Sequence, residues 1–305
     1  MPAVDLDRVT KRYGATTALD EVSLSIEPGE MFGIIGPDGA GKTTMIRVIC
    51  GLLRPDGGSV RIAGHDPVRQ HRAVTARVGY LSQRFSLYGD LSIDENIAFF
   101  ADIHGLTDYD VRRDRLLEMT RLTAFRQRRA DRLSGGMKQK LALACTLVHE
   151  PDVILLDEPT TGVDPVSRRE FWKLLSEFLS GGLTIVMATP YLDEAERCAR
   201  VALLHEGRVL ALDEPKRLQR AFRGELYEVV ADPHRAAQEA LARVDGITDR
   251  QTFGERLHVR TNEGARDVEA NIRGALQASG VRVTSIRRIP PSLEDVFIDR
   301  VTSKG

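Results

Sequence analysis

The sequence predicts an α/β fold in two domains, a larger one over residues 1–220 and a small accessory domain over residues 221–305. Two observations support this prediction. Up to Pro215, apolar runs typical of buried strands alternate with segments of helical spacing, a pattern that favours a layered α/β domain. From Glu225 onward the order becomes strand, helix, strand, strand, helix, strand, which is typical of a ferredoxin-like α+β domain.

The strands of the larger domain are predicted from their apolar patterns. Residues 22–26 alternate between apolar and polar side chains, as a half-buried strand does, and Pro28 and Gly29 end it. Residues 153–156 and 183–188 are apolar without alternation, as expected of central parallel strands that are covered on both faces. The other predicted elements are short strands at 60–62 and 78–81 and a helix at 168–179.

The smaller domain is predicted from the same two periodicities. Its four strands are expected at residues 226–230, near 247, at 257–259 and at 281–286. Its helices are expected at residues 233–244 and 265–279, with a last helical piece at 291–298. Residues 221–305 contain no constellation typical of a site, so a structural or dimer-bracing role is favoured over a binding role.

Composition narrows the class of protein. Of the 305 residues, 29% are charged and 42% are hydrophobic, which is ordinary for a globular protein. The net charge of −1 argues against a nucleic-acid surface, and no apolar run reaches the roughly 18 residues of a membrane helix. Residues 1–7 are acidic without an apolar signal core, so a cytoplasmic location is expected. The widely spaced Cys50, Cys145 and Cys198 are expected to be reduced packing residues.

The most informative stretch is a glycine-rich turn between a predicted strand, residues 30–35, and a predicted helix, residues 44–50. It fits the phosphate-loop pattern G-x-x-x-x-G-K-[ST]. Its glycines let backbone N–H groups surround phosphate oxygens, and the helix N-terminus adds partial positive charge. Lys42 is expected at the β- and γ-phosphates of a nucleotide, and the Thr43 hydroxyl at Mg²⁺. The predicted nucleotide contacts here are Gly36, Pro37, Asp38, Gly39, Ala40, Gly41, Lys42, Thr43 and Thr44.

Two further motifs point to phosphate chemistry. Asp157 and Glu158 end an apolar strand, so Asp157 is expected to hold Mg²⁺ and Glu158 to orient and deprotonate the attacking water. The turn Ser134-Gly135-Gly136 opens a helix, where the Ser134 side chain is expected to cap the helix and the N–H groups to favour an anion. One chain thus carries two γ-phosphate-compatible sites but one full phosphate loop. Two such sites with a single phosphate loop make sense if the second site serves the nucleotide of a neighbouring chain.

Together these motifs resemble the ATP-binding subunit of an ABC transporter, over residues 1 to about 215. The matching segments are the phosphate loop 36–43, the glutamine segment 81–83, the signature 133–139, the acidic pair 157–158 and the loop 159–165. The resemblance implies a P-loop NTPase fold, ATP and Mg²⁺ as cofactors, and two such subunits, identical or different, stacked head to tail. Each ATP is then expected between the phosphate loop of one chain and the signature of the other. The signature residues expected to contact it are Ser134, Gly135, Gly136 and Gln139.

The resemblance implies roles for three other positions. Tyr13 lies where the family stacks an aromatic ring on adenine. Gln83 lies where the family's glutamine contacts Mg²⁺ and the attacking water. Residues 84–89 lie where the family meets its membrane partner, although an ordinary core patch would explain the same aromatic side chains.

Two positions depart from the family pattern. Pro190 occupies the place of a histidine that bonds the γ-phosphate, and proline offers neither an N–H nor a side-chain donor. The neighbouring Thr189 has a hydroxyl, but its reach is shorter. Slow hydrolysis is therefore expected, or pairing with a different subunit whose site is complete. Asp38 replaces a common asparagine, and its carboxylate is expected to face either a cation or donor, or the neighbouring chain.

The tail, which ends in residues 291–297, resembles the C-terminal extension of bacterial multidrug and antibiotic exporter ATPases. The resemblance implies an ATPase that powers export of a substrate through a separate membrane permease, bound at the inner face of the cell membrane. The alternatives are a low-turnover nucleotide-binding scaffold, which Pro190 supports, and a soluble regulator acting on ribosomes or DNA. Against the regulator, the chain has no internal repeat, basic tract or heptad run.

Overall fold

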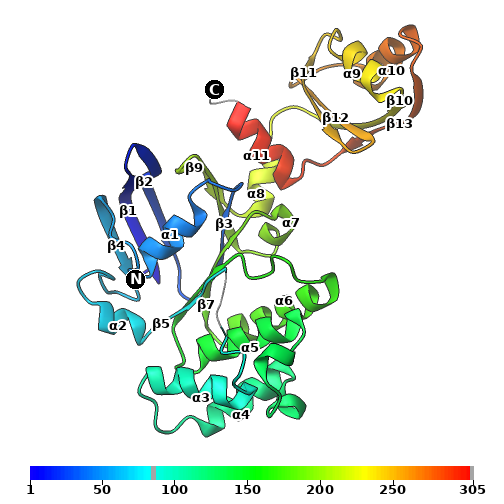
Figure 1. Cartoon of the computed structure of the whole chain (residues 1–305). Helices are drawn as coiled ribbons and strands as arrows, with labels where there is room; N and C mark the ends of the chain where they lie inside the picture. The colour runs from blue at the N-terminus through cyan, green and yellow to red at the C-terminus, as the bar shows by residue number, and fades with distance from the viewer. Residues whose placement is uncertain (84–86, 303–305) are drawn as a thin grey trace. The chain divides into compact units, whose positions relative to one another are not determined.

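The computed structural model describes residues 1–83 and 87–302 (Figure 1). The chain divides into two compact units, Met1–Pro215 and Lys216–Gly305. Helix α8, Pro215–Arg220, runs across that division along the chain. Within the described ranges, no helix is both long and apolar enough to cross a membrane.

A six-stranded sheet with the strand order β5-β6-β7-β3-β8-β9 forms the centre of the first unit. Its strands are β3 (Met31–Ile35), β5 (Val78–Leu81), β6 (Val153–Asp157), β7 (Thr184–Thr189), β8 (Arg200–His205) and β9 (Arg208–Asp213). The first five in this order are parallel, and β9 pairs antiparallel with β8. Every residue of β3, β6 and β7 is buried, as their apolar runs predict. Because these three strands are adjacent and parallel, their carboxyl ends meet at one edge of the sheet.

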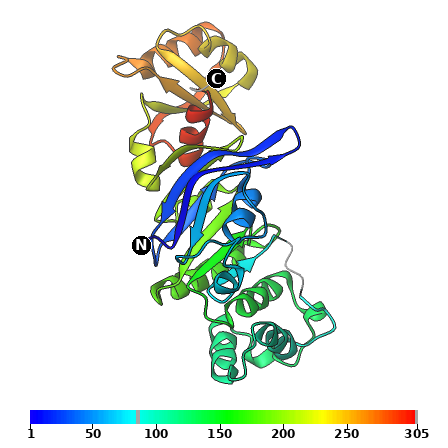
Figure 2. The same cartoon turned by 90° about the vertical axis from the view of Figure 1, so that its left-hand side faces the viewer.

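A three-stranded antiparallel sheet with the order β2-β1-β4 belongs to the same unit. Its strands are β1 (Val4–Tyr13), β2 (Thr16–Ile26) and β4 (Gly57–Ile62). Figure 2 shows β1 and β2 as a long pair of dark-blue ribbons. Apolar side chains of both sheets share one core with helix α1 (Lys42–Ile49), as Leu24, Phe32 and Ile46 illustrate. The helix that follows the glycine-rich turn is therefore anchored on both sheets.

Four longer helices complete the first unit, namely α3 (Ile93–Ile103), α4 (Asp110–Thr120), α5 (Gly135–Leu147) and α6 (Pro165–Ser180). Helix α5 packs against α3, α4 and α6, and Figure 1 shows these helices grouped at one end of the unit. Side chains fix where they begin. Ser92 and Glu95 form a capping box at α3, and the Asp164 carboxylate accepts two backbone N–H groups at α6. Helix α6 therefore begins at Pro165, earlier than the predicted residue 168. The shorter helical elements are α2 (His71–Thr75), α7 (Leu192–Ala195) and the 3₁₀ turns Thr123–Phe125 and Ala130–Arg132.

The second unit contains a four-stranded antiparallel sheet with the order β11-β12-β10-β13. Its elements are β10 (Leu226–Asp232), α9 (His234–Leu241), β11 (Ile247–Phe253), β12 (Arg256–Thr261), α10 (Val268–Ala278), β13 (Arg282–Ile289) and α11 (Leu293–Thr302). The first six follow the ferredoxin-like order that the sequence predicts. One core, which includes Val229, Ile272 and Ile286, packs the sheet against α9 and α10. Strand β12 is joined to α11 by a hydrogen bond of 2.9 Å between His258 Nδ1 and Asp295 Oδ1.

Candidate functional site

The turn between β3 and α1 has glycine where close contacts demand it. A Cβ atom on Gly36 would lie 2.2 Å from the Leu204 carbonyl oxygen, and one on Gly41 would lie 2.4 Å from the Ala18 carbonyl oxygen. Gly41 also has a left-handed φ of 106°, and it is the N-cap of α1. The fold of the chain therefore dictates the outer glycines of the loop before any ligand is considered.

Lys42 is nearly buried, and its ammonium group is surrounded by oxygens. It donates hydrogen bonds to the carbonyl oxygens of Gly36, at 2.9 Å, and Pro37, at 3.1 Å. It forms an ion pair with the Glu158 carboxylate at 3.3 Å. Asp38 lies 3.8 Å from the same ammonium group, but its side chain is 96% exposed. The carboxylate of Asp38 thus projects mainly into solvent.

Asp157 ends β6 as a buried carboxylate beside α1. Its Oδ1 accepts a hydrogen bond of 3.0 Å from the Thr43 hydroxyl, while its Oδ2 is buried without a partner among the described residues. Burial raises the pKa of Asp157, although the Thr43 hydrogen bond acts in the opposite direction. A partnerless buried carboxylate oxygen next to a hydroxyl fits Mg²⁺, which takes few protein ligands alongside substrate phosphates and water. The described residues contain no cluster of three His, Cys, Asp or Glu side chains that could hold a metal ion.

Glu158 follows in an unusual backbone conformation. Its φ of 51° lies in the left-handed region, and its N–H donates to the Ala188 carbonyl oxygen of β7 at 2.8 Å. Its Oε2 accepts hydrogen bonds from Gln83 Nε2 at 2.9 Å and from the Thr161 hydroxyl at 3.4 Å. Glu158 therefore lies between Gln83 and Lys42. The phosphate loop and the acidic pair 157–158 both predict the terminal phosphate near this place.

Most of these residues line one open groove of about 580 Å³, although Asp157 and Gly36 are not part of its described lining. Its lining residues are Tyr13, Ala18, Asp38, Gly39, Gly41, Lys42, Thr43, Thr44, Gln83, Glu158, Thr161, Pro190 and Tyr191. Tyr13 lies at the end of β1 with 47% of its surface exposed, and the Lys11 ammonium lies 5.7 Å from its ring centre. The residues predicted from distant parts of the chain are thus brought together at the carboxyl edge of the parallel sheet.

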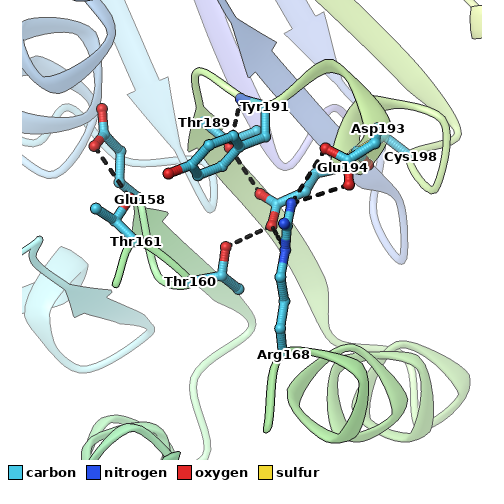
Figure 3. Close-up of polar contacts among 9 residues, drawn as sticks. All are labelled: Glu158, Thr160, Thr161, Arg168, Thr189, Tyr191, Asp193, Glu194 and Cys198. Atoms are coloured by element: carbon cyan, nitrogen blue, oxygen red, sulfur yellow. Dashed lines mark hydrogen bonds and ion pairs between the residues drawn. The ribbon is translucent and has the colours of Figure 1, made fainter. Parts of the chain in front are cut away.

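Beyond β7 the chain is fixed by a buried carboxylate (Figure 3). Glu194 is 1% exposed and accepts hydrogen bonds from the Thr160 hydroxyl, the Thr189 hydroxyl at 2.7 Å and Arg168 Nε at 2.8 Å. The Thr189 oxygen in turn accepts the N–H of Tyr191 at 3.1 Å. A hydroxyl group has one proton to donate, and that of Thr189 is already donated to Glu194. The hydroxyl beside the proline therefore does not supply the missing donor in this arrangement.

The signature turn lies apart from the groove, whose described lining includes none of its residues. Ser134 Oγ accepts the N–H of Met137 at 3.3 Å and caps α5 as expected. A Cβ atom on Gly136 would lie 2.3 Å from Ser167 Oγ, so packing against α6 requires this glycine. A Cβ atom on Gly135 would have no other atom within 4 Å. Gln139 is half-buried on α5. Packing within the chain accounts for Gly136 but not for Gly135.

The expected contact with a membrane partner lies partly outside the described residues, because these exclude 84–86. Of the remaining segment, Tyr88 is 45% exposed and its ring centre lies 4.4 Å from that of Phe99. The ring therefore packs on α3 and keeps an exposed side, so both interpretations of this segment stay open.

Two family models match the chain. The model "ABC transporter" matches residues 19–161, and "ATP-binding protein DrrA1-3-like, C-terminal domain" matches residues 214–301. The daunorubicin resistance ATP-binding protein DrrA3 of Streptomyces coeruleorubidus is 36% identical to the chain, over 97% of the chain and 95% of DrrA3. The chain belongs to the ABC transporter ATP-binding family. The family predicted from the motifs is thereby confirmed, and an ATP-binding role follows from it.

This ABC protein is also similar to the probable multidrug ABC transporter ATP-binding protein YbhF of Escherichia coli (strain K12), with 40% identity over 99% of the chain. The chain spans about half the length of YbhF, namely 52%. A solved dimeric bacterial ABC transporter cassette matches with a TM-score of 0.62 and 30% identity, over 69% of this chain and 98% of the cassette. The P-loop NTPase fold is confirmed by this likeness.

The sequence did not single out every residue that shapes the groove of this ABC protein. Thr161, Tyr191 and the buried Glu194 were missed, as were its partners Thr160 and Arg168. Glu194 is one of several acidic residues at 193–196, and no pattern distinguishes the one that is buried. The proline at 190 was the available signal, because it drew attention to the segment that carries Tyr191.

Proposed function

We propose that this ABC protein hydrolyses ATP to power export of a substrate through a separate membrane permease. We further propose that it works head to tail with a second ATP-binding subunit, identical or different, at the inner face of the cell membrane. The names of two relatives, which refer to multidrug transport and to daunorubicin resistance, support the exporter class. The dimeric cassette supports the pairing of subunits.

The proposed chemistry begins with Lys42. In the structure its ammonium group bonds neutral carbonyl oxygens, and charged phosphate oxygens are stronger acceptors for it. We expect ATP to draw Lys42 onto its β- and γ-phosphates, while the N–H groups of residues 36–44 surround the phosphates and Tyr13 stacks on adenine. Binding then separates Lys42 from Glu158, which leaves that carboxylate available as a base.

Glu158 is the proposed general base, and Gln83 the group that orients the attacking water. Their mutual hydrogen bond of 2.9 Å keeps both side chains on the same wall of the groove. An ionised carboxylate at this place can accept a proton from the attacking water. Mg²⁺ held by Thr43, Asp157 and Gln83 would neutralise charge on the phosphates.

The signature turn is proposed to complete the site of the partner subunit. Ser134, Gly135 and Gly136 open α5, so their N–H groups carry the partial positive charge of a helix N-terminus. Gly135 faces open space, which leaves room for the close approach of a phosphate from another chain. Gln139 lies on the next turn of the same helix and is proposed as a further contact.

One observation carries this proposal, the position of Glu158 between Lys42 and Gln83 at the groove. Glu158→Gln keeps the shape of the side chain but removes the base, so we expect hydrolysis to fall by roughly 10²-fold or more. ATP then persists, and light scattering with ATP is expected to show more dimer than for the wild type. Glu177→Gln, at an exposed position of α6, is the matched control. A wild-type rate in Glu158→Gln would contradict the assignment.

The low-turnover scaffold remains a second candidate because of Pro190, which has no donor to offer a phosphate. It predicts ATP binding with a hydrolysis rate no higher in the wild type than in Glu158→Gln. A steady-state phosphate-release assay on the purified wild-type chain separates the two functions. A wild-type rate well above that of the variant supports the transport ATPase.

A further inference from the structure

Tyr191 lies on the groove with an unused hydroxyl group. It lines the groove together with Lys42, Gln83 and Glu158, and 38% of its surface is exposed. Figure 3 shows its hydroxyl at the end of the ring that points toward Glu158 and Thr161. Among the residues that the structure describes, this hydroxyl has no hydrogen-bond partner. A phenol O–H is therefore available to a molecule in the groove.

One contact fixes the backbone of Tyr191 and another lies against its ring. Its backbone N–H donates to Thr189 Oγ1 at 3.1 Å, and the guanidinium carbon of Arg168 lies 4.8 Å from its ring centre. Arg168 is itself fixed by ion pairs with Glu194, at 2.8 Å, and Asp193, at 3.1 Å. A side chain that is positioned before the ligand binds loses little entropy when it makes a contact. The surroundings of Tyr191 thus resemble those of a binding group rather than of a loose surface residue.

The proline before Tyr191 contributes to the same geometry. Pro190 restricts its own φ and disfavours helical backbone at Thr189, and Tyr191 is itself extended, with φ of −88° and ψ of 115°. With Tyr191 extended, α7 begins at Leu192. This extended stretch carries the Tyr191 ring over the groove instead of along the helix.

The groove needs neutral or positive donors for the terminal phosphate. Its charged lining includes two carboxylates, Asp38 and Glu158, and one cation, Lys42. A phenol O–H adds a donor on the β7 side without a negative charge. Such a donor can stabilise the charge that is spread over the phosphoryl oxygens in the transition state.

We propose that Tyr191 is a further catalytic residue, whose hydroxyl donates a hydrogen bond to the terminal phosphate of ATP. The proposal rests on the proposed ATPase function and names the donor that Pro190 and Thr189 do not provide. Tyr191 keeps its proton throughout, since its role is to stabilise charge and not to transfer a proton. Glu158 remains the base.

Tyr191→Phe tests this proposal, because it removes the hydroxyl and leaves the ring on Arg168 and the backbone hydrogen bond in place. We expect kcat for ATP hydrolysis to fall by roughly 10- to 100-fold, while ATP affinity measured by calorimetry stays near the wild-type value. Trapping of ADP by orthovanadate, which imitates the transferring phosphate, is expected to weaken in parallel with kcat. Tyr109→Phe, before helix α4, is the matched control.

A second variant separates loss of the hydroxyl from a disturbance of the loop by phenylalanine. Tyr191→His retains a donor on the same backbone, so it is expected to keep more of kcat than Tyr191→Phe. Equal losses in both variants, or an unchanged kcat and unchanged trapping in Tyr191→Phe, would overturn the role of the hydroxyl. The failure of the proposed function looks different, because the wild type would then show no hydrolysis above that of Glu158→Gln.

Discussion

The two glycine turns of this ABC protein both open a helix, yet their surroundings differ. The turn before α1 is enclosed by its own chain, since β-carbons at Gly36 and Gly41 would collide with carbonyl oxygens of Leu204 and Ala18. The turn before α5 is enclosed on one side only, where Gly136 packs on Ser167. Its other glycine, at 135, faces open space.

The difference shows what each turn still lacks. Around the first turn, Lys42 is already paired with Glu158, and Thr43 is already hydrogen-bonded to Asp157. The second turn has a cap for its helix in Ser134 but contributes nothing to the described lining of the groove. A turn whose side chains are paired within one chain has the groups to bind a ligand alone, whereas we propose that the open turn acts on a ligand brought by another molecule.

The largest effect is expected from removing the cation of the first turn. Lys42→Ala deletes a nearly buried charge that we expect to bind phosphate oxygens, so ATP affinity should fall on the order of 100-fold. Calorimetric titration with ATP measures it. Lys173→Ala, at an exposed position of α6, is the control. If Lys42→Ala binds ATP as the wild type does, the first turn is not the nucleotide site.

A negative charge placed at the second turn tests whether that turn meets a nucleotide. Gly135→Asp favours the start of α5 through the helix dipole, yet it repels a phosphate brought by another chain. We expect ATP binding to the isolated chain to persist, while hydrolysis falls by roughly 10-fold or more and the ATP-dependent dimer is lost. Gly274→Asp, on an open glycine of α10, controls for the added charge. Unchanged hydrolysis in Gly135→Asp would show that this turn meets no nucleotide.

The smallest effect is expected from the second unit, which carries neither turn. We propose that the functional boundary lies at residue 220 and that a chain ending at Arg220 folds and binds ATP with unchanged affinity. Each unit has its own core, and the groove is lined entirely by residues before 216 as far as the structure describes it. Lost binding in a truncated chain whose circular dichroism shows it folded would refute this expectation.

The sequence predicted the elements that have a strong local signal. The buried strands β6 and β7 are uninterrupted apolar runs, and the phosphate loop has its lysine and threonine in register between a strand and a helix. Strand β1 was missed because its burial pattern is irregular, with register shifts along its pairing with β2. A bulged strand loses the alternation by which strands are recognised.

Site residues that belong to a sequence motif could be predicted, whereas residues placed only by tertiary contacts could not. Asp157 and Glu158 were found because they lie at the end of a buried strand. Thr160, Arg168 and Glu194 belong to three different segments, and what unites them is a set of hydrogen bonds that forms only on folding. The same holds for Tyr191, whose position depends on Arg168 and Thr189.

The buried Glu194 has a consequence for how long the groove keeps its shape. The segment after β7 is near the surface, and such loops usually exchange their amide protons quickly. Here the N–H of Tyr191 donates to the Thr189 hydroxyl oxygen, and that hydroxyl donates to Glu194. The N–H of Glu158 donates to the Ala188 carbonyl oxygen of β7. Opening the segment at Tyr191 would expose a carboxylate that has three donors and almost no contact with water, and opening it at Glu158 would break a bond to the central sheet. These two amides are therefore expected to exchange with deuterium as slowly as those of the central sheet, on a wall that faces solvent.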